Sequence, residues 1–425
     1  MSLLRSGYYG LLWASAPLIS GYLAWRAHKG HEDKTRIHER LGHSKIARPD
    51  LPLLWVNAVS VGEAVAALTI IQAIQKEYPR IHVLLTTTTP TSAKVVGARL
   101  PKNVTHQYCP VDTPQAVNRF LNHWQPDLAI WIESELWPNL LHGTQVRAIP
   151  TVLLNGRMSG KSYANWKKLK SMISPLLSRL ELCAVQSEEQ AIYFHALGAE
   201  NISIMGNAKL LISPLGGVDV KKYEDFKKEI GDRPLWLAAS TQPGEDEIIL
   251  KAHKDLQRMY PDLLTILVPR HIGRGSVIQN LASKEGIKAS LRTETKSLKD
   301  VELYIGNTMG ELGVFFALSP VVFMGATFVP KGGHNPIEAA QMGAYVLHGV
   351  HTFNNPQLYD TLASLKLSQV VTDENTLSSH VAPWLKGKKE TYEEPSPLAK
   401  YREKGLKDLT ILLNPYLSSL REVRE

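Results

Sequence analysis

Short apolar runs alternate with amphipathic stretches along most of the chain, and residues 64–77 are one stretch with helical spacing. This alternation predicts an α/β fold, in which helices cover both faces of a parallel sheet. The strand-like runs of a first series are residues 53–56, 82–87, 128–132, 151–154, 182–185 and 202–205. Those of a second series are residues 235–239, 264–268, 301–305, 321–324 and 345–347.

A Pro/Gly-rich break at residues 213–217 separates the two series. We therefore expect two Rossmann-like domains that face an interdomain cleft, at residues 30–212 and 213–390. Residues 1–29 and 391–425 flank them, and residues 398–420 have the pattern of an amphipathic helix. Ligands of open α/β sheets bind beyond the carboxyl ends of the strands, so the strand-to-helix turns are where chemistry is expected.

The N-terminal segment predicts a membrane-anchor helix. Residues 7–25 carry no charge, which is close to the ~20 residues that span a bilayer. A basic stretch at residues 26–40 follows, so the positive-inside rule places the rest of the chain in the cytoplasm. Gly10, Pro17 and Gly21 weaken a spanning helix, which leaves a helix in the membrane interface as an alternative. A cleaved signal peptide is disfavoured because residues 24–27 form a poor cleavage site.

Composition and short motifs limit the kinds of partner, metal site and nucleotide-binding motif that this chain is expected to have. The 425 residues include 48 Lys and Arg against 40 Asp and Glu, and the net charge of +8 favours an anionic partner. Two cysteines and 15 histidines without metal-ligand spacing give no reason to expect a metal site. A G-x-G-x-x-G fingerprint is absent. The P-loop-like residues 156–162 have three residues between their glycines where that motif needs four.

The turn after the first strand contains Ser60, Gly62 and Glu63. Ser60 and Glu63 fit a capping box, in which the glutamate only returns a hydrogen bond to the helix cap. The functional interpretation is that Gly62 lets a ligand approach while Glu63 acts as a general base. The spacing leaves both interpretations open.

Three turns of the second half have a similar character. Ser240-Thr241 and Pro269-Arg270 follow strands, and Arg270 suits either a bidentate phosphate contact or a surface ion pair. Residues 308–311 repeat the capping-box pattern before a predicted helix at residues 312–318. The exposed amides of that helix suit an anion, although a purely structural cap is the alternative.

The segment from 331 to 340 is the strongest candidate for a nucleotide site. Asn335 fits a helix cap, Pro336 the first helical position and Glu338 the third. The two preceding glycines allow backbone amides to approach a phosphate, and the carboxylate of Glu338 suits ribose hydroxyls. We therefore predict that a helix starts here beside a bound nucleotide.

Together these motifs resemble the bacterial 3-deoxy-D-manno-octulosonic acid (Kdo) transferase family, inverting glycosyltransferases of the GT-B fold. The matching segments are residues 59–63 (VSVGE), 86–91 (TTTTPT), 131–138 (WIESELWP), 206–209 (GNAK), 268–271 (VPRH), 306–311 (GNTMGE) and 332–338 (GGHNPIE). Asn57 and Asn207 are local departures from the family pattern that could alter acceptor contacts.

The resemblance implies transfer of Kdo from CMP-Kdo to a lipid A precursor, lipid IVA, in lipopolysaccharide inner-core biosynthesis. Glu63 resembles the general base, Glu133 and Lys209 resemble polar groups at the reaction centre, and Ser60 and Gly62 lie on the acceptor side. The residues expected to bind CMP are Ser240, Thr241, Pro269, Arg270, Met309, Gly310, Glu311, Gly333, Asn335, Pro336, Ile337 and Glu338. No metal or other cofactor is expected, because CMP carries a single phosphate.

The expected location is the cytoplasmic side of the bacterial inner membrane, where the basic stretch would attract an anionic surface and a phosphorylated acceptor. No nucleic-acid partner is expected. By analogy with the fold, the C-terminal helix at 391–425 crosses back onto the first domain. The alternatives are another nucleotide-sugar GT-B enzyme at the membrane and an inactive, membrane-tethered nucleotide-binding module.

Overall fold

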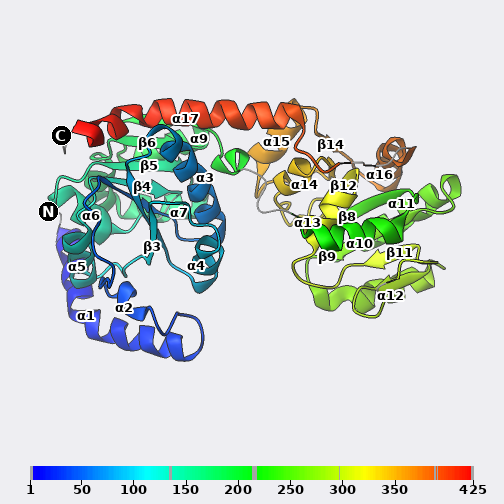
Figure 1. The fold of residues 1–425 in the computed structure, drawn as a ribbon, viewed down its shortest axis with the longest axis horizontal. Coiled ribbons are helices and arrows are strands. Elements are labelled where there is room, and N and C mark those ends of the chain that lie inside the picture. The colour runs from blue at the N-terminus through cyan, green and yellow to red at the C-terminus, as the bar shows by residue number, and fades with distance from the viewer. Residues whose placement is uncertain are drawn as a thin grey trace. The chain divides into compact units, whose positions relative to one another are not determined.

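The computed structural model describes residues 3–133, 136–212, 218–295, 297–386, 389 and 391–422. The chain forms two compact units, one of Met1–Ile212 with Glu403–Glu425 and the other of Ser213–Arg402. Figure 1 labels most of their helices and strands. The predicted break at residues 213–217 lies outside the described residues.

The first unit is built on a parallel sheet with strand order β3-β2-β1-β4-β5-β6-β7. All five residues of β1 are buried, and alternate side chains enter separate hydrophobic cores on the two faces. This burial on both faces is what the continuous apolar runs predict. The strands are β1 (Leu53–Asn57), β2 (His82–Thr87), β3 (Val104–Tyr108), β4 (Leu128–Ile132), β5 (Thr151–Gly156), β6 (Leu182–Val185) and β7 (Ile202–Ile204).

Helices cover both faces of this sheet. Buried residues of α3 and α17 contribute to one core, and residues of α5, α6, α8 and α9 contribute to the other. The helical elements of the unit are α1 (Leu3–His28), α2 (Ile37–Arg40), α3 (Val61–Glu77), α4 (Pro90–Gly97), α5 (Pro114–Trp124), α6 (Pro138–Val146), α7 (Gly160–Lys168), α8 (Lys170–Leu177), α9 (Glu188–Leu197), the 3₁₀ helix η1 (Ala208–Leu211) and α17 (Ser396–Glu422), which also extends into the second unit.

The second unit repeats this design. Its parallel sheet has strand order β10-β11-β9-β8-β12-β13-β14. The strands are β8 (Leu235–Thr241), β9 (Leu264–Pro269), β10 (Ala289–Leu291), β11 (Leu303–Ile305), β12 (Val321–Met324), β13 (Tyr345–His348) and β14 (Ser368–Val370). The helical elements are α10 (Val220–Ile230), α11 (Asp246–Met259), η2 (Ile272–Arg274), α12 (Gly275–Lys284), α13 (Leu312–Leu318), α14 (Ile337–Gln341), α15 (Pro356–Ser364), α16 (Glu374–Val381) and η3 (Ala382–Lys386). Two Rossmann-like units confirm the predicted α/β fold class.

Each sheet has one point where the strand order reverses, and ligands of such sheets bind there. In the first unit it lies between β1 and β4, and in the second between β8 and β12. The turns that follow these four strands are therefore the places where the fold positions a site.

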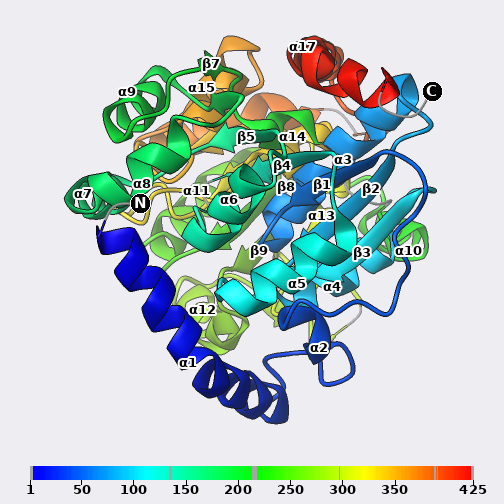
Figure 2. The ribbon, with the colours of Figure 1, turned by 90° about the vertical axis from the view of Figure 1, so that its left-hand side faces the viewer.

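The N-terminal apolar segment forms α1, which packs against α2, α5 and α8 of the first unit (Figure 2). Leu23 and Ala27 are buried, whereas Leu11, Leu18 and Trp25 remain exposed. In the part of the chain that the structure describes, no helix has both the length and the hydropathy needed to cross a membrane.

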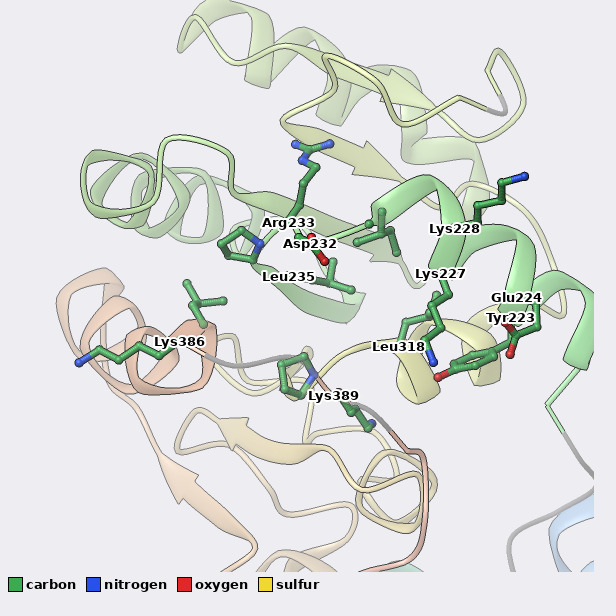
Figure 3. Close-up of a pocket in the computed structure, with 15 residues that line it drawn as sticks. Tyr223, Glu224, Lys227, Lys228, Asp232, Arg233, Leu235, Leu318, Lys386 and Lys389 are labelled. Atoms are coloured by element: carbon green, nitrogen blue, oxygen red, sulfur yellow. The ribbon is translucent and has the colours of Figure 1, made fainter.

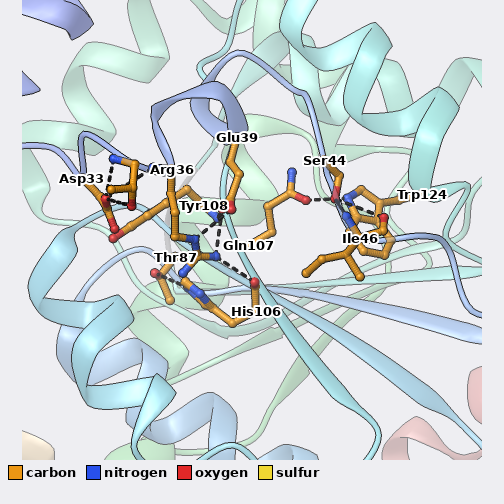
Figure 4. A network of polar contacts seen from close by, with 11 residues as sticks. Asp33, Arg36, Glu39, Ser44, Ile46, Thr87, His106, Gln107, Tyr108 and Trp124 are labelled. Carbon is orange, nitrogen blue, oxygen red and sulfur yellow. Dashed lines mark hydrogen bonds and ion pairs between the residues drawn. The ribbon is translucent and has the colours of Figure 1, made fainter.

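A polar network joins the segment after α1 to β3, the edge strand of the first sheet (Figure 4). Arg36 donates to both carboxylate oxygens of Glu39 and to the carbonyl of His106. The Glu39 carboxylate in turn accepts the backbone N–H of Tyr108 at 2.8 Å. Side chains thus satisfy backbone groups that an edge strand would otherwise leave unpaired.

Candidate functional site

Glu63 lies at the carboxyl end of β1, in the first turn of α3. Its Oε2 accepts the backbone N–H of Val59 at 2.9 Å, and its Oε1 accepts the hydroxyl of Ser60 at 2.6 Å. The Ser60 hydroxyl also accepts the Glu63 N–H, which confirms Ser60 as the helix cap. The second half of the predicted capping box differs, because the Glu63 carboxylate accepts the N–H of Val59 and not that of Ser60. The cap fixes the carboxylate at the reversal point between β1 and β4.

The predicted acceptor-side residues beside Glu63 are accessible at the surface. Ser60 and Gly62 are exposed, and a Cβ atom built on Gly62 would meet nothing within 4 Å. The fold itself therefore does not need a glycine here. The absent side chain leaves room for a ligand to approach the Glu63 carboxylate.

Glu133 follows β4, the neighbour of β1, and has a left-handed backbone with φ of 63°. Its Oε1 accepts a hydrogen bond from Asn155 Nδ2 at 3.3 Å. Burial, and then the charge of Glu63, raise the pKa of Glu133, while Lys209 and Arg157 oppose the rise. The predicted catalytic residues Glu63 and Lys209 are therefore both within electrostatic reach of Glu133.

Lys209 lies on η1, which Asn207 caps by accepting the Lys209 N–H at 3.0 Å. The Oδ1 of Asn155 accepts the N–H of Ala208 at 2.9 Å and the side-chain amide of Gln186 at 2.9 Å. Asn155 thus connects Glu133 to the turn that carries Lys209. Sequence reasoning missed Asn155 and Gln186 because each is a single amide, Asn155 near the end of β5 and Gln186 directly after β6, and only the fold brings them together.

In the second unit, Ser240 and Thr241 are the last residues of β8, where the register with β9 shifts. Ser240 has a φ of 59°, whereas Thr241 is fully buried and its hydroxyl donates to Asp246 at 2.9 Å. The Thr241 hydroxyl thus supports the loop, and binding of CMP by Thr241 stays a prediction. Ser240 keeps a half-buried position at the strand end.

Pro269 ends β9, and the exposed Arg270 follows it directly. The backbone N–H of Arg270 donates to the carbonyl of Thr241 at 3.0 Å, which ties this turn to the end of β8. Burial lowers the pKa of His334, and the charges of Arg270 and His271 lower it further. Arg270 therefore lies within electrostatic reach of the glycine-rich loop of the same unit.

The glycine-rich loop is held by its backbone carbonyls. Tyr359 donates its hydroxyl to the carbonyl of His334 at 2.7 Å, and Asn355 donates to the carbonyl of Gly333 at 3.2 Å. Gly333 has a φ of 75°, and its N–H donates to the carbonyl of Ala326 at 2.8 Å. The amide of Gly333 thus has an acceptor inside this unit, and the part that Gly333 takes in binding CMP stays a prediction.

The helix after this loop begins one residue later than predicted. Helix α14 starts at Ile337, Pro336 is its N-cap residue, and the side chain of Asn335 accepts the Ile337 N–H at 3.1 Å. Glu338 is therefore the second helical residue, and it is exposed. Pro336 and Ile337 are buried at the helix start, and their contact with CMP stays a prediction.

The turn before α13 differs from its predicted role. Met309 and Gly310 are exposed, and Gly310 has a φ of 83°. Glu311 pairs with Arg292 at 3.0 Å and Lys222 at 3.1 Å and gives α13 no side-chain cap. Burial would raise the pKa of Glu311, but hydrogen bonds from Arg292, Thr308 and Lys222 outweigh it and lower the pKa to about 2. The capping box predicted here is wrong, because the carboxylate is held in an ion-pair network.

A separate pocket of about 500 Å³ opens at the amino ends of β8 and β12, where Leu235 and Pro320 line it (Figure 3). It includes none of the predicted CMP-binding residues, which lie at or beyond the carboxyl ends of the strands of this sheet. Among the described residues, no group of three or more His, Cys, Asp or Glu side chains is arranged to hold a metal ion.

Comparison with known proteins places this geometry in context. A family model described as 3-deoxy-D-manno-octulosonic-acid transferase (kdotransferase) matches residues 35–212. A 3-deoxy-D-manno-octulosonic acid transferase of Haemophilus influenzae is 35% identical over 375 residues, covering 85% of this chain and 86% of the relative. A probable mitochondrial 3-deoxy-D-manno-octulosonic acid transferase of Arabidopsis thaliana is 36% identical, covering 81% of this chain and 79% of the relative.

A solved structure shares the fold at low sequence identity. The UDP-GlcNAc 2-epimerase of Neisseria meningitidis, solved with UDP-GlcNAc, has a TM-score of 0.54 and 14% identity, covering 84% of this chain and all of that chain. At this identity the likeness supports the two-domain fold alone.

Proposed function

The chain belongs to the Kdo transferase family and is a glycosyltransferase of lipopolysaccharide biosynthesis, and we propose that it transfers Kdo from CMP-Kdo to the lipid A precursor lipid IVA. The observation that carries the proposal is the pair of carboxylates at the reversal point of the first sheet. Glu63 follows β1, Glu133 follows the neighbouring strand β4, and the charge of one acts on the other.

The surroundings of the two carboxylates separate their roles. Glu63 accepts hydrogen bonds from Val59 and Ser60 at the N-terminus of α3, where the helix dipole favours a negative charge. Glu133 has a raised pKa because it is buried and faces that charge. Glu63 is the carboxylate that lies beside the open acceptor-side residues Ser60 and Gly62, so we assign the base to Glu63.

The proposed reaction is a single displacement with inversion. A hydroxyl oxygen of the acceptor glucosamine forms a bond to the anomeric carbon of Kdo, and Glu63 accepts the hydroxyl proton. The bond between the anomeric carbon and the CMP phosphate oxygen breaks, and CMP leaves with its electron pair. Lys209, Glu133 and their amide support adjust the charge around the transition state.

On the second unit, Arg270 is the proposed contact to the donor phosphate, with the α14 turn beside the ribose. The single phosphate of CMP carries little charge, so we propose that Arg270 and backbone amides suffice without a metal or other cofactor. The exposed apolar face of α1 and the net charge of +8 support association with an anionic membrane surface. We propose that this surface is the cytoplasmic face of the bacterial inner membrane.

The test is product analysis by mass spectrometry after incubation of detergent-solubilised protein with CMP-Kdo and a tetraacylated, bisphosphorylated lipid A precursor. The expected result is a mass gain of one or more Kdo units together with released CMP. No gain from a folded protein that binds CMP would contradict the proposed acceptor. No binding of CMP would contradict the donor.

The variant E63Q tests the base. We expect it to fold and bind CMP but to lose turnover by about 10²–10⁴-fold, because the amide cannot accept the proton. E77Q, at the exposed far end of the same helix, is the matched control and should keep wild-type turnover. Near-wild-type turnover of E63Q would reduce Glu63 to the helix cap.

A further inference from the structure

Glu245 is a fully buried carboxylate at the reversal point of the second sheet. It lies in the turn between β8 and α11, four residues after the end of β8. Its Oε2 accepts the N–H groups of Ala326 at 2.7 Å and Gln242 at 2.8 Å. Its Oε1 accepts those of Thr327 at 2.9 Å and Phe328 at 3.0 Å.

These four contacts join the turns after two neighbouring strands. Ala326, Thr327 and Phe328 follow β12, and the left-handed Ala326, with φ of 64°, turns three successive N–H groups toward one point. Such a nest of amides is an anion-binding arrangement, and here the protein's own carboxylate occupies it. Among the described residues, no lysine or arginine forms an ion pair with Glu245, so the amides alone compensate its charge.

The turn after β12, which Glu245 holds, also supports the glycine-rich loop. The carbonyl of Ala326 accepts the Gly333 N–H, and the carbonyl of Thr327 accepts the His351 N–H at 3.0 Å. The Thr327 hydroxyl accepts the N–H of Gly349 at 2.8 Å. A displaced turn after β12 would therefore carry residues 333 and 349 with it.

The turn after β12 is also packed closely against the end of β8 and against the turn after β13, so these segments do not shift independently. A Cβ atom built on Gly325 would lie 2.6 Å from the carbonyl oxygen of Ser240, and one on Gly349 would lie 2.3 Å from that of Thr327. Close backbone packing of this kind transmits a displacement instead of absorbing it. The end of β8 and the loop that contains Gly333 are thus fixed relative to one another through one buried group, Glu245.

We propose that Glu245 is a positioning residue of the donor site, which holds the end of β8 and the glycine-rich loop in the arrangement that binds the nucleotide. This inference rests on the proposed function, in which that loop receives CMP. Glu245 itself does not contact the donor, because all of its acceptor capacity is directed at backbone amides.

The substitution E245Q tests the role with almost no change in shape. A glutamine offers one acceptor oxygen and turns an NH₂ group toward amides that are themselves donors. Titration calorimetry should show CMP binding weakened by about 10- to 100-fold, since small displacements of positioning groups have effects of this size. E247Q, an exposed neighbour on α11, is the control and should bind CMP as the wild type does.

Steady-state kinetics separate positioning from general loss of structure. E245Q should raise KM for CMP-Kdo while kcat at saturating donor stays within about threefold, because the proposed base lies on the other unit. A fold that was merely destabilised would lower the active fraction, and hence kcat, at unchanged KM. The charge-conserving E245D should restore CMP binding partly or fully.

Equal CMP affinity of E245Q, E247Q and the wild type would overturn the inference and leave the proposed function intact. Failure of the wild type to bind CMP would overturn both. If E245Q does not fold, T327V and T327S replace it, because only T327S keeps the hydroxyl that bonds Gly349. Weaker CMP binding by T327V than by T327S supports the inference, and equal binding overturns it.

Discussion

Arg270 is exposed directly after β9, while its backbone N–H is fixed to Thr241. A guanidinium on a fixed backbone can form charge-assisted, bidentate hydrogen bonds with a phosphate. We expect R270A to raise KM for CMP-Kdo and to weaken CMP binding by about 10- to 100-fold, with folding unaffected. Donor titration of the initial rate and calorimetry with CMP measure the two effects.

R258A is a suitable control for this change, since Arg258 is also exposed and contacts the carboxylate of Asp255 at the end of α11. It removes the same charge from the same unit without reaching the end of β9. Unchanged CMP affinity in R270A would show that Arg270 is an ordinary surface residue that does not contact the donor.

His253 makes stability depend on pH. It is fully buried on α11, its Nδ1 shares a hydrogen bond with Thr265 at 2.8 Å, and burial lowers its pKa to about 4. In the protonated ring both nitrogens carry a hydrogen, and Nε2 has no hydrogen-bond partner among the described residues. Below the ordinary pKa of about 6.5 the unfolded state binds the proton more readily, so stability is lost as the pH falls from about 6.5 towards 4.

We expect H253N to remove about 2 kcal/mol from the loss of stability between neutral pH and about pH 4.5. The asparagine does not titrate in this range. Denaturant unfolding at a series of pH values measures the difference. H195N, which changes an exposed histidine, should leave the pH profile unaltered, and an unaltered profile in H253N as well would exclude His253 as its source.

At the scale of elements, α17 contributes one apolar stripe to the first unit. Leu409, Leu413 and Leu417 are buried in the same core as β1 and α3, whereas Ile411 on the opposite side of the helix is 61% exposed. We expect L413A to lower the free energy of unfolding by about 2–5 kcal/mol, because it leaves a cavity in a close-packed core. Thermal unfolding measures this loss.

The same deletion of side-chain volume in I411A should change stability by less than about 0.5 kcal/mol, because Ile411 is exposed to water. Equal effects of L413A and I411A would mean that residues 403–422 do not stabilise the first unit. A large effect of L413A alone would identify α17 as a structural part of it.

The central strands were predictable from sequence and three of the edge strands were not. Runs such as residues 82–87 and 128–132 match β2 and β4, since strands buried on both faces are continuously apolar. The strands without a prediction are β3, β10 and β14, and each lies at the edge of its sheet. With one neighbour and less burial, β3 can carry the polar sequence VTHQY, which has no apolar signal.

In the candidate site, contacts between residues close in sequence were predictable, and contacts between residues far apart in sequence were not. Ser60 and Glu63 are three residues apart, so their spacing alone predicts the hydrogen bonds that they form with one another. Glu311 fits the same pattern but is captured by Arg292, which lies 19 residues away in sequence. Competition of this kind depends on which strands are neighbours, and one sequence does not reveal it.

At the scale of the whole molecule, the basic stretch at residues 26–40 is less able to attract an anionic surface than its sequence suggests. Within the basic stretch, Arg26 and Arg40 pair with Glu32, and Arg36 pairs with Glu39. These ion pairs neutralise much of the local charge. Attraction to an anionic surface therefore depends on the net charge of +8 together with the exposed apolar side chains of α1.

This view predicts how the protein partitions onto lipid vesicles. Leu11, Leu18, Tyr22 and Trp25 repeat at intervals of three, four and seven residues, so they lie on one face of α1, and all are exposed. An apolar helix face binds the membrane interface in proportion to its buried area. We expect L18S with W25S to weaken flotation with anionic vesicles by about tenfold or more, since each change removes an apolar contact of about 1 kcal/mol or more.

The matched control is V146S with I411S, two exposed apolar residues outside α1. If apolar contact through α1 determines binding, this control floats like the wild type, and added salt weakens both proteins only in part. If net charge alone determines binding, L18S with W25S floats normally and salt releases every variant, because screening acts on charge and not on apolar contact. The two experiments together separate the contribution of one helix from that of the molecule's charge.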